Sequence, residues 1–280
     1  MKDLSKRFIL SLIAVPVLIC LFLFAFNPWF QYVVILAVAG ITCIAVWEYE
    51  QLVKTIGGKL NLPVIILFSL LEVIAFFAAA RYPQLIWAPV LIFFIAFFCI
   101  CLAHFHEKEG AIIDLAVSSF SLLYIAIPMG MILGILYFSG AQDGRWWVAY
   151  LFIVTKITDV GAYFAGQLWG RRKLAPAISP GKTVEGTLFG LLCAIAASVG
   201  FYLLSYFSRV ENFHLGLPQS LILGVILGLI GPLGDLCESL LKRDANKKDS
   251  NRLPGFGGVL DMVDSLLFNA PIIYLYLKIL

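Results

Sequence analysis

Charged side chains are scarce in this sequence of 280 residues: Asp, Glu, Lys and Arg together make up 13% of it, whereas 61% is hydrophobic. The mean hydropathy of +0.96 lies well outside the range of a soluble globular domain. The scarcity of charge therefore excludes a soluble enzyme, and the net charge of +3 is too small to indicate a nucleic-acid partner. We expect an integral membrane protein.

The sequence also lacks the cysteine and histidine patterns that hold metals or disulfide frameworks. Its six cysteines lie in or beside apolar runs, no two form a C-x-x-C pair, and the three histidines do not cluster with them. We interpret the cysteines as small core residues. No clear internal repeat is present, which counts against the transporter folds that are built from inverted repeats.

Long apolar runs, in contrast, are abundant. A membrane-spanning helix needs roughly 20 predominantly apolar residues. The candidate spans cover residues 8–26, 28–47, 63–80, 85–103, 111–138, 146–167, 187–208, 219–233 and 260–279. No small-residue cleavage site follows the first run, so we expect it to be retained as a span. The predicted fold class is all-α, a polytopic integral membrane protein with about nine transmembrane helices.

Basic residues are divided unevenly between the two ends of these spans. If the N-terminus is cytoplasmic, most of the 20 Lys and Arg residues fall in cytoplasmic loops, where positive charge is retained. The pattern therefore predicts a cytoplasmic N-terminus and an external C-terminus. The simplest assignment is a bacterial cytoplasmic (inner) membrane with the polar loops facing the cytoplasm.

Polar residues divide the chain into two regions. Residues 1–150 have only short polar connections and are predicted to be scaffold helices. Residues 151–280 contain two long polar loops, predicted at 168–186 and 234–259, and ionisable residues occur in the spans beside them. We expect the functional site in this C-terminal region, because ionisable residues inside a membrane are costly and mark function.

The first polar group is Lys156 and Asp159, which lie three positions apart and therefore on one helix face. A structural ion pair explains this spacing as well as a functional site does. The second group follows in a loop shaped by Pro and Gly. It contains Ser179, Lys182, Thr183 and Glu185, and its hydroxyl and ammonium groups could hold a phosphate.

The third polar group is a stripe at i, i+3, i+4 and i+7, formed by Asp235, Glu238, Ser239 and Lys242. This spacing predicts one face of a helix, and a solvated face is its ordinary interpretation. Lys242 and Arg243 begin a basic stretch that is also typical of a lipid-headgroup patch.

The fourth polar group is Asp261 and Asp264, three residues apart at the start of the last apolar run. Their Cβ atoms would lie about 5–6 Å apart on one helix face, and two such negative charges require a cation between them. Mg²⁺ takes one or two carboxylates and leaves its other positions to water and phosphate oxygens. The positive end of the helix dipole explains one aspartate better than two. We therefore predict a Mg²⁺ site.

Two stretches together resemble the phosphatidate cytidylyltransferases, the CDP-diacylglycerol synthases of membranes. The first is ITDVGAYFAGQLWGRRKLAPAISPGKTVEG, and the second is GDLCESLLKR followed by KKDSNRLPGFGGVLDMVDSLLF. The resemblance is close over residues 156–187 and 234–268. The family commonly has histidine, arginine and tryptophan where this chain has Phe256, Met262 and Val184.

The resemblance implies transfer of CMP from CTP to phosphatidic acid, which gives CDP-diacylglycerol and pyrophosphate at the face of the lipid bilayer. With it, Asp261, Asp264 and Asp235 become the expected metal ligands; whether a second cation joins Mg²⁺ stays open. Lys182 is expected to be catalytic. The expected substrate-binding residues are Lys156, Asp159, Ser179, Lys182, Thr183, Glu185, Glu238, Ser239, Lys242 and Arg243. Whether the chain acts as a homodimer is open.

Two other functions are compatible with a polytopic membrane protein, but the sequence lacks their patterns. CDP-alcohol phosphotransferases and prenyltransferases also act on activated lipids, but their D-G-x-x-A-R and D-x-x-x-D patterns are absent. A cation-coupled transporter would need acidic residues spread through the depth of several helices. Here the acidic residues gather at the predicted cytoplasmic ends.

Overall fold

The computed structural model describes residues 23–105, 109–138, 140, 142–208, 212–247 and 258–279. Eight helices in these ranges are long and apolar enough to cross a membrane. They confirm the predicted polytopic all-α class and match every expected span except the first, at 8–26, most of which lies outside the described residues. The chain is an integral membrane protein. The side of the membrane on which its N-terminus lies stays a prediction.

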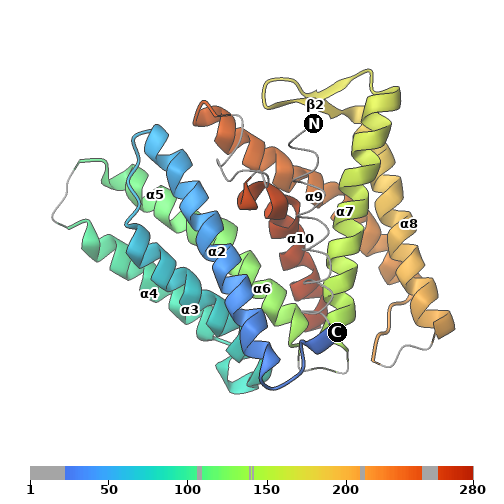
Figure 1. The fold of residues 1–280 in the computed structure, drawn as a ribbon, viewed down its shortest axis with the longest axis horizontal. Coiled ribbons are helices and arrows are strands. Elements are labelled where there is room, and N and C mark those ends of the chain that lie inside the picture. The colour runs from blue at the N-terminus through green and yellow to red at the C-terminus, as the bar shows by residue number, and fades with distance from the viewer. Residues whose placement is uncertain are drawn as a thin grey trace, which may run out of the picture. The chain divides into compact units, whose positions relative to one another are not determined.

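The chain divides into two compact units, and each is described by itself (Figure 1). The first unit comprises residues 1–137 and 244–262. Its helices are α2 (Phe30–Thr55), α3 (Leu62–Arg81), η1 (Pro83–Leu85), α4 (Ala88–Ala103), α5 (Ala111–Ser121), the π-helical η2 (Leu122–Ala126) and α6 (Ile127–Leu136). Helix α3 is central to this unit, because it packs against α2, α4 and α6.

Close packing of α3 against α6 depends on a glycine. A Cβ atom at Gly130 of α6 would lie 2.4 Å from a ring carbon of Phe76 and 3.3 Å from the carbonyl oxygen of Glu72, both on α3. Small residues bring helix backbones together in membranes, where lipid provides no hydrophobic driving force between helices.

The last helix, α10 (Val259–Ile279), begins in the first unit. The first N–H groups of a helix have no partner within it. Here the buried carboxylate of Glu48, on α2, accepts hydrogen bonds from the N–H groups of Val259 at 2.9 Å and Leu260 at 2.8 Å. Asp261 accepts one from the N–H of Gly258 at 3.2 Å. A side chain more than 200 positions away in the sequence therefore fixes the start of α10.

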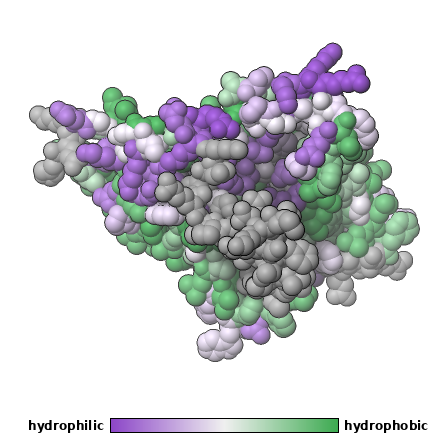
Figure 2. Space-filling view, turned by 45° about the horizontal axis from the view of Figure 1, so that its top comes forward, coloured by the Kyte–Doolittle hydropathy of each residue, from purple (hydrophilic) through white to green (hydrophobic). Residues whose placement is uncertain are grey.

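The second unit comprises residues 138–243 and 263–280. It contains α7 (Gly144–Trp169), β1 (Lys173–Ala175), β2 (Ser179–Thr183), α8 (Val184–Ser208), α9 (Leu217–Asp244) up to residue 243, and the rest of α10. Helices α7 and α8 lie side by side with the hairpin β1–β2 at one end of the pair (Figure 1). Figure 2 shows hydrophilic side chains over this hairpin end and hydrophobic ones along the two helices.

Glycines bring α7 and α8 into close contact. A Cβ atom at Gly186 would lie 2.5 Å from the carbonyl oxygen of Ala162, and one at Gly190 would lie 2.8 Å from that of Thr158. Both contacts are too short for any side chain, so the glycines are required for this backbone approach. The tight pair fixes where the hairpin between its helices emerges.

The connections differ from the predicted loops. Residues 173–183, expected to be loop, form a two-stranded antiparallel sheet in which Lys173 pairs with Thr183 and Ala175 with Ser179. Helix α9 extends to Asp244, eleven residues beyond the predicted span. An estimate based on apolar length ends a span at its first charge, whereas this helix continues because Glu238 and Lys242 form an ion pair on it. The helix predicted for the polar stripe is confirmed, but the interpretation of its face as solvated is wrong, because Glu238 and Ser239 are buried.

Candidate active site

Two carboxylates of the second unit approach each other through a serine. Asp159 lies on α7, and Asp264 lies on α10. The hydroxyl of Ser265 donates to Oδ1 of Asp264 at 3.2 Å and lies 3.4 Å from Oδ1 of Asp159. The N–H of Ser265 also donates to Oδ1 of Asp264, at 2.6 Å. Ser265 and Asp264 are buried, so the pair is held away from bulk water.

Lys182 links the hairpin to α9. Its ammonium nitrogen lies 2.9 Å from Oδ2 of Asp235 and donates to the carbonyl oxygen of Pro232 at 3.0 Å. Strand β2 directs Lys182 toward α9, and its side chain is 19% exposed. The structure therefore brings together Lys182 and Asp235, which were predicted from separate stretches of sequence.

Charge connects these groups into one cluster. The Asp264 carboxylate is repelled by those of Asp235 and Asp159. Lys156 attracts both Asp159 and Asp264, and Lys182 attracts Asp159. The closest Lys156–Asp159 approach is 3.7 Å, with both side chains partly exposed. Three acidic and two basic groups leave the cluster with one net negative charge when all are ionised, which suits it to a cation.

A cavity of about 510 Å³ opens beside the cluster. Its lining includes Asp159, Lys182, Asp235, Ser179 and Thr183 of the predicted set, together with Ala162, Tyr163, Gly166, Gln167, Lys173, Gly181, Thr187 and Pro232. Volumes of a few hundred to about 1,000 Å³ are typical of small-molecule sites. The cavity joins α7, the hairpin and α9, so the hairpin forms one of its walls.

The remaining polar residues of α9 support this arrangement. Ser239 donates to Oδ1 of Asp235 at 3.4 Å, and Lys242 pairs with the fully buried Glu238. Nε of Arg243 donates to the carbonyl oxygen of Ile178, at the turn of the hairpin, at 3.0 Å. These contacts hold α9 and the hairpin together.

Two predicted site residues act at the start of α8. The Thr183 hydroxyl accepts a hydrogen bond from the N–H of Gly186 at 3.1 Å, the usual contact of a helix N-cap. Glu185 does not line the cavity, and its carboxylate accepts hydrogen bonds from the N–H groups of Arg171 and Arg172. Glu185 therefore lies outside the cluster of Asp159, Asp235 and Asp264.

Asp261 belongs to the first unit, whereas Asp264 belongs to the second. Asp261 is half-buried and engaged with the N–H of Gly258, an arrangement close to a capping box. The capping interpretation, weaker for two aspartates, therefore describes this one well. Met262, where the family commonly has arginine, is 48% exposed. Phe256 lies outside the described residues.

Among the described residues, no group of three or more His, Cys, Asp or Glu side chains is close enough to form a preformed metal site. The cluster nevertheless fits an ion that the protein holds only in part. Mg²⁺ is usually bound by one or two carboxylates, with water and substrate phosphate completing its coordination. Asp159 and Asp264, brought together by Ser265, supply such a pair, and Asp235 lies within their electrostatic reach.

Sequence reasoning missed Ser265, Lys173, Tyr163 and Gln167. Ser265 directly follows Asp264, but its role requires that α10 face α7, which no spacing reveals. Gln167 and Tyr163 lie one turn apart on α7, where the amide of Gln167 donates to the Tyr163 hydroxyl at 2.7 Å. Their polar spacing on the helix was the available signal.

Comparison with known proteins places the whole chain in one family. The model of the cytidylyltransferase family matches residues 5–280. The chain belongs to this family. The resemblance inferred from the two polar stretches is thereby confirmed, and family membership extends over the N-terminal helices as well.

Curated relatives of this cytidylyltransferase-family chain are bacterial proteins named phosphatidate cytidylyltransferase. The relative from Chlamydia muridarum (strain MoPn / Nigg) is 40% identical over 179 residues, which cover 62% of this chain and 58% of the relative. The relative from Chlamydia pneumoniae is 43% identical over 175 residues, which cover 61% of this chain and 56% of the relative. The relative from Staphylococcus haemolyticus (strain JCSC1435) is 38% identical over 173 residues, which cover 61% of this chain and 62% of the relative. The matched part thus spans less than two thirds of each relative.

Proposed function

We propose that this membrane protein is a phosphatidate cytidylyltransferase, which transfers CMP from CTP to phosphatidate and releases pyrophosphate. The observation that carries the proposal is the contact of Lys182 with Asp235 in a cavity that also contains Asp159. Such a site combines an ammonium group for phosphate with carboxylates for a cation. Family membership and the names of the bacterial relatives support the same reaction.

The reaction requires two anions to approach each other. A phosphate oxygen of phosphatidate attacks the α-phosphorus of CTP, a new P–O bond forms, and the bond from the α-phosphorus to the bridging oxygen breaks with its electron pair leaving on pyrophosphate. No general base is needed, because the attacking phosphate is already ionised at neutral pH. The protein's task is to neutralise charge and to align the two phosphates.

Lys182 and Ser179 are proposed to bind phosphate oxygens from the hairpin wall of the cavity. The ammonium group of Lys182 would exchange part of its contact with Asp235 for the incoming phosphate, while Asp235 keeps the lysine directed into the cavity. Lys156 is proposed to offset the negative charge of Asp159. Lys242 and Arg243 are proposed to stabilise the wall, since each already contacts a protein group.

Mg²⁺ is the proposed cofactor, held by Asp264 together with Asp159 and Asp235. When bound, this cation supplies charge neutralisation to the phosphate oxygens. Asp261 is proposed to contribute through the first turn of α10, which its side chain caps. Ser265 is proposed to keep Asp159 and Asp264 together.

The lipid substrate accounts for the placement of polar groups on membrane helices. Removing a diacyl chain from the bilayer costs about 0.8 kcal/mol per CH₂ group, so the enzyme must bring water-soluble CTP to the headgroup plane. We propose that the hairpin end of α7 and α8 faces the cytoplasm of a bacterial inner membrane, where CTP is available.

The test is an assay of the full-length protein in detergent with labelled CTP, phosphatidate and Mg²⁺. We expect CDP-diacylglycerol from the wild type and a loss of at least about 100-fold in kcat for Asp264→Asn, by analogy with the removal of one electrostatic contact to a transition state. Asp143→Asn is the matched control, because Asp143 caps the opposite end of α7. No product from the wild type with any phosphatidate would overturn the proposal.

Metal binding is tested separately from turnover. Mn²⁺ can replace Mg²⁺ at oxygen-rich sites, and its binding can be followed by electron paramagnetic resonance. We expect Asp264→Asn and Asp235→Asn to weaken Mn²⁺ binding at least about tenfold, and Asp143→Asn to leave it unchanged. Equal Mn²⁺ affinity in all four proteins would refute the metal assignment even if the enzyme is active.

A further inference from the structure

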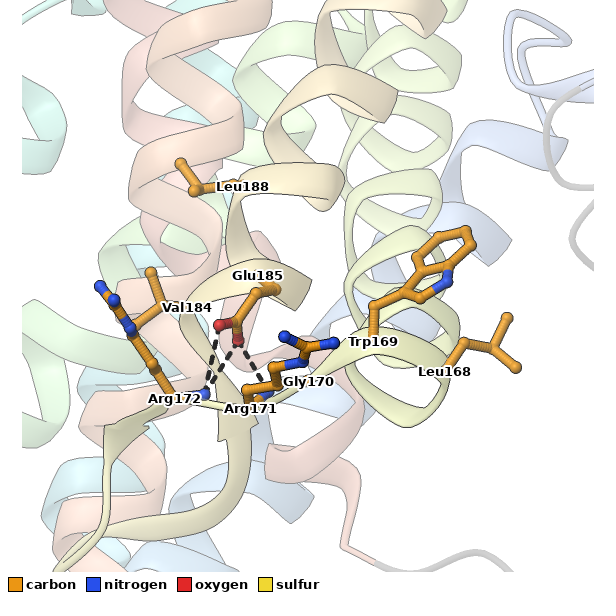
Figure 3. Close-up of a pocket in the computed structure, with 8 residues that line it drawn as sticks. All are labelled: Leu168, Trp169, Gly170, Arg171, Arg172, Val184, Glu185 and Leu188. Carbon is orange, nitrogen blue, oxygen red and sulfur yellow. Dashed lines mark hydrogen bonds between the residues drawn. The ribbon is translucent and has the colours of Figure 1, made fainter.

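A second cavity of the second unit, about 550 Å³ in volume, lies at the turn between α7 and β1 (Figure 3). It is lined by Leu168, Trp169, Gly170, Arg171, Arg172, Val184, Glu185 and Leu188. None of these residues lines the candidate active-site cavity. The proposed transfer reaction therefore leaves this cavity without a role.

The backbone of the turn is held by one carboxylate. Oε2 of Glu185 accepts a hydrogen bond from the N–H of Arg171 at 3.0 Å, and both of its oxygens accept from the N–H of Arg172, at 3.1 and 3.2 Å. The N–H of Val184 donates to the carbonyl oxygen of Arg172 at 2.9 Å. Because a Cβ atom at Gly170 would lie 2.2 Å from the carbonyl oxygen of Gly166, only glycine fits at this position.

These contacts leave the two arginine side chains exposed. Figure 3 shows their guanidinium groups on either side of the Glu185 carboxylate. Neither guanidinium group has a hydrogen bond or a salt bridge to any side chain in the described parts of the chain. Two arginines and one glutamate give the cavity one net positive charge, and the hydrogen bonds of Glu185 go to backbone N–H groups, so both guanidinium groups can still pair with an anion.

Large apolar side chains surround this charge. Leu168 is 70% exposed, Trp169 60% and Leu188 57%. They belong to the last turn of α7 and the first turns of α8, two helices that are long and apolar enough to cross a membrane. A tryptophan at the end of a span is typical of the membrane–water interface, and the arginines follow it directly. The cavity therefore combines an apolar side with a cationic side at the end of two spans.

We propose that this cavity binds the phosphate headgroup of an anionic glycerophospholipid from the surrounding bilayer, at a site separate from the candidate active site. The arginines pair with the phosphate, since guanidinium groups form strong hydrogen bonds with phosphate oxygens. Trp169, Leu168 and Leu188 contact the glycerol and the first part of the acyl chains. A soluble nucleotide would gain nothing from the exposed leucines.

The test is a lipid titration of the full-length protein in detergent, followed by native mass spectrometry. Dioleoylphosphatidylglycerol, dioleoylphosphatidate and zwitterionic dioleoylphosphatidylcholine are compared on the wild type, on the double variant Arg171→Gln/Arg172→Gln and on Arg81→Gln, an exposed control arginine of the first unit. We expect the wild type and Arg81→Gln to prefer the anionic lipids. The double variant should bind them roughly tenfold or more weakly, because each interfacial arginine contributes to this attraction.

The two anionic lipids distinguish the source of the phosphate. Binding of phosphatidylglycerol identifies a bulk-lipid site, whereas binding of phosphatidate alone identifies a docking site for the substrate lipid; in either case the loss must follow the two arginines. Equal anionic lipid binding in the double variant would overturn the proposal. So would displacement of the lipid by millimolar inorganic phosphate or CTP, because the occupant would then be a soluble anion.

A second measurement does not depend on the arginine variants. Phosphatidylglycerol with brominated acyl chains should quench the part of the fluorescence that Trp169→Phe removes, and it should do so at lower lipid concentration than brominated phosphatidylcholine. Equal quenching by the two lipids would contradict a preference for anionic lipid at this cavity. Turnover of CTP is a separate readout, so failure of this lipid site leaves the proposed reaction untouched.

Discussion

The hydroxyl of Ser265 lies between two acidic side chains that repel each other. It is 3.2 Å from Oδ1 of Asp264 and 3.4 Å from Oδ1 of Asp159, and it is almost fully buried. A single hydroxyl proton can donate to only one carboxylate at a time. Lys156 offsets part of the repulsion, but the cluster keeps one net negative charge when all its groups are ionised, which is the reason to place a cation there.

Removal of this hydroxyl gives the first prediction. In Ser265→Ala the Asp159 and Asp264 carboxylates lose their shared partner, so the Mg²⁺ concentration for half-maximal activity should rise about tenfold, as expected for residues that orient metal ligands. The measurement is a Mg²⁺ titration of initial rates together with Mn²⁺ binding.

The control for this prediction is Ser205→Ala. The Ser205 hydroxyl donates to the carbonyl oxygen of Phe213, near the end of α8 that is opposite the hairpin. Its removal should leave the Mg²⁺ requirement unchanged. A lower kcat for Ser265→Ala with the same Mg²⁺ requirement and the same Mn²⁺ affinity would contradict a role in cation binding.

Single residues were predicted unevenly from the sequence. Lys182 and Asp235 were found because ionisable groups near membrane spans are rare and conspicuous. Their contact could not be found, since it depends on strand β2 directing Lys182 toward α9. Asp261 was found by its spacing from Asp264; the hydrogen bond that its carboxylate accepts from the N–H of Gly258 could not be found in this way, and its role as a metal ligand stays a prediction.

At the scale of elements, the start of α10 depends on α2. Glu48 is fully buried, and its carboxylate accepts hydrogen bonds from the N–H groups of Val259 and Leu260. In Glu48→Gln the amide oxygen can accept one of these N–H groups, but the NH₂ group cannot accept the other. The free energy of unfolding should fall by about 1–3 kcal/mol, the usual cost of leaving a buried polar group unsatisfied.

Thermal unfolding in detergent measures this effect, with Glu109→Gln as the matched control because Glu109 is exposed. The same transition temperature in Glu48→Gln and in the wild type would show that the cap contributes nothing to stability. A loss of stability without a change in Mn²⁺ affinity would place the effect in the first unit alone.

The contact between α7 and α8 gives a prediction in which two glycines of one helix respond with opposite signs. Gly190→Ala places a methyl group 2.8 Å from the carbonyl oxygen of Thr158, so the helices must separate, and we expect a loss of about 1–3 kcal/mol. Gly200→Ala meets nothing within 4 Å. It should stabilise α8 by up to about 1 kcal/mol through helix propensity.

Unfolding of the two variants in detergent, measured side by side, tests this contact. If Gly190→Ala is as stable as Gly200→Ala, then α7 and α8 do not depend on the close approach of their backbones. Activity provides a second readout, because the hairpin between these helices carries Lys182.

Elements were predicted well where apolar length decides them and poorly where tertiary contacts do. Spans such as 63–80 and 111–138 correspond closely to the observed helices, because the bilayer fixes their length. The hairpin at 173–183 has only eleven residues and contains Pro and Gly, so its sequence predicts a loop. Its pairing is supported by Arg243, which contacts the turn at Ile178 from α9.

At the scale of the whole molecule, family membership covers residues 5–280, whereas the stretches that suggested it lie in the C-terminal region. The first unit also includes the segment 244–262 from that region, and the functional division at residue 150 stays a prediction. Composition could predict membrane insertion, because insertion depends on the total number of apolar residues. The packing of the start of α10 within the first unit depends on contacts such as Glu48 with Leu260, which composition does not encode.

Orientation in the membrane is the last prediction, and it follows from the distribution of Lys and Arg. The hairpin should face the cytoplasm, while the connection between α8 and α9 should face outward. In a cysteine-free background, Gly181→Cys reports on the hairpin, where a Cβ atom meets nothing within 4 Å, and His214→Cys reports on the exposed connection. A membrane-impermeant maleimide added to intact spheroplasts should label position 214 at once and position 181 only after permeabilisation. The reverse pattern would place Lys182 and its cavity on the side of the membrane that lacks CTP, and the proposed reaction could not then occur in the cell.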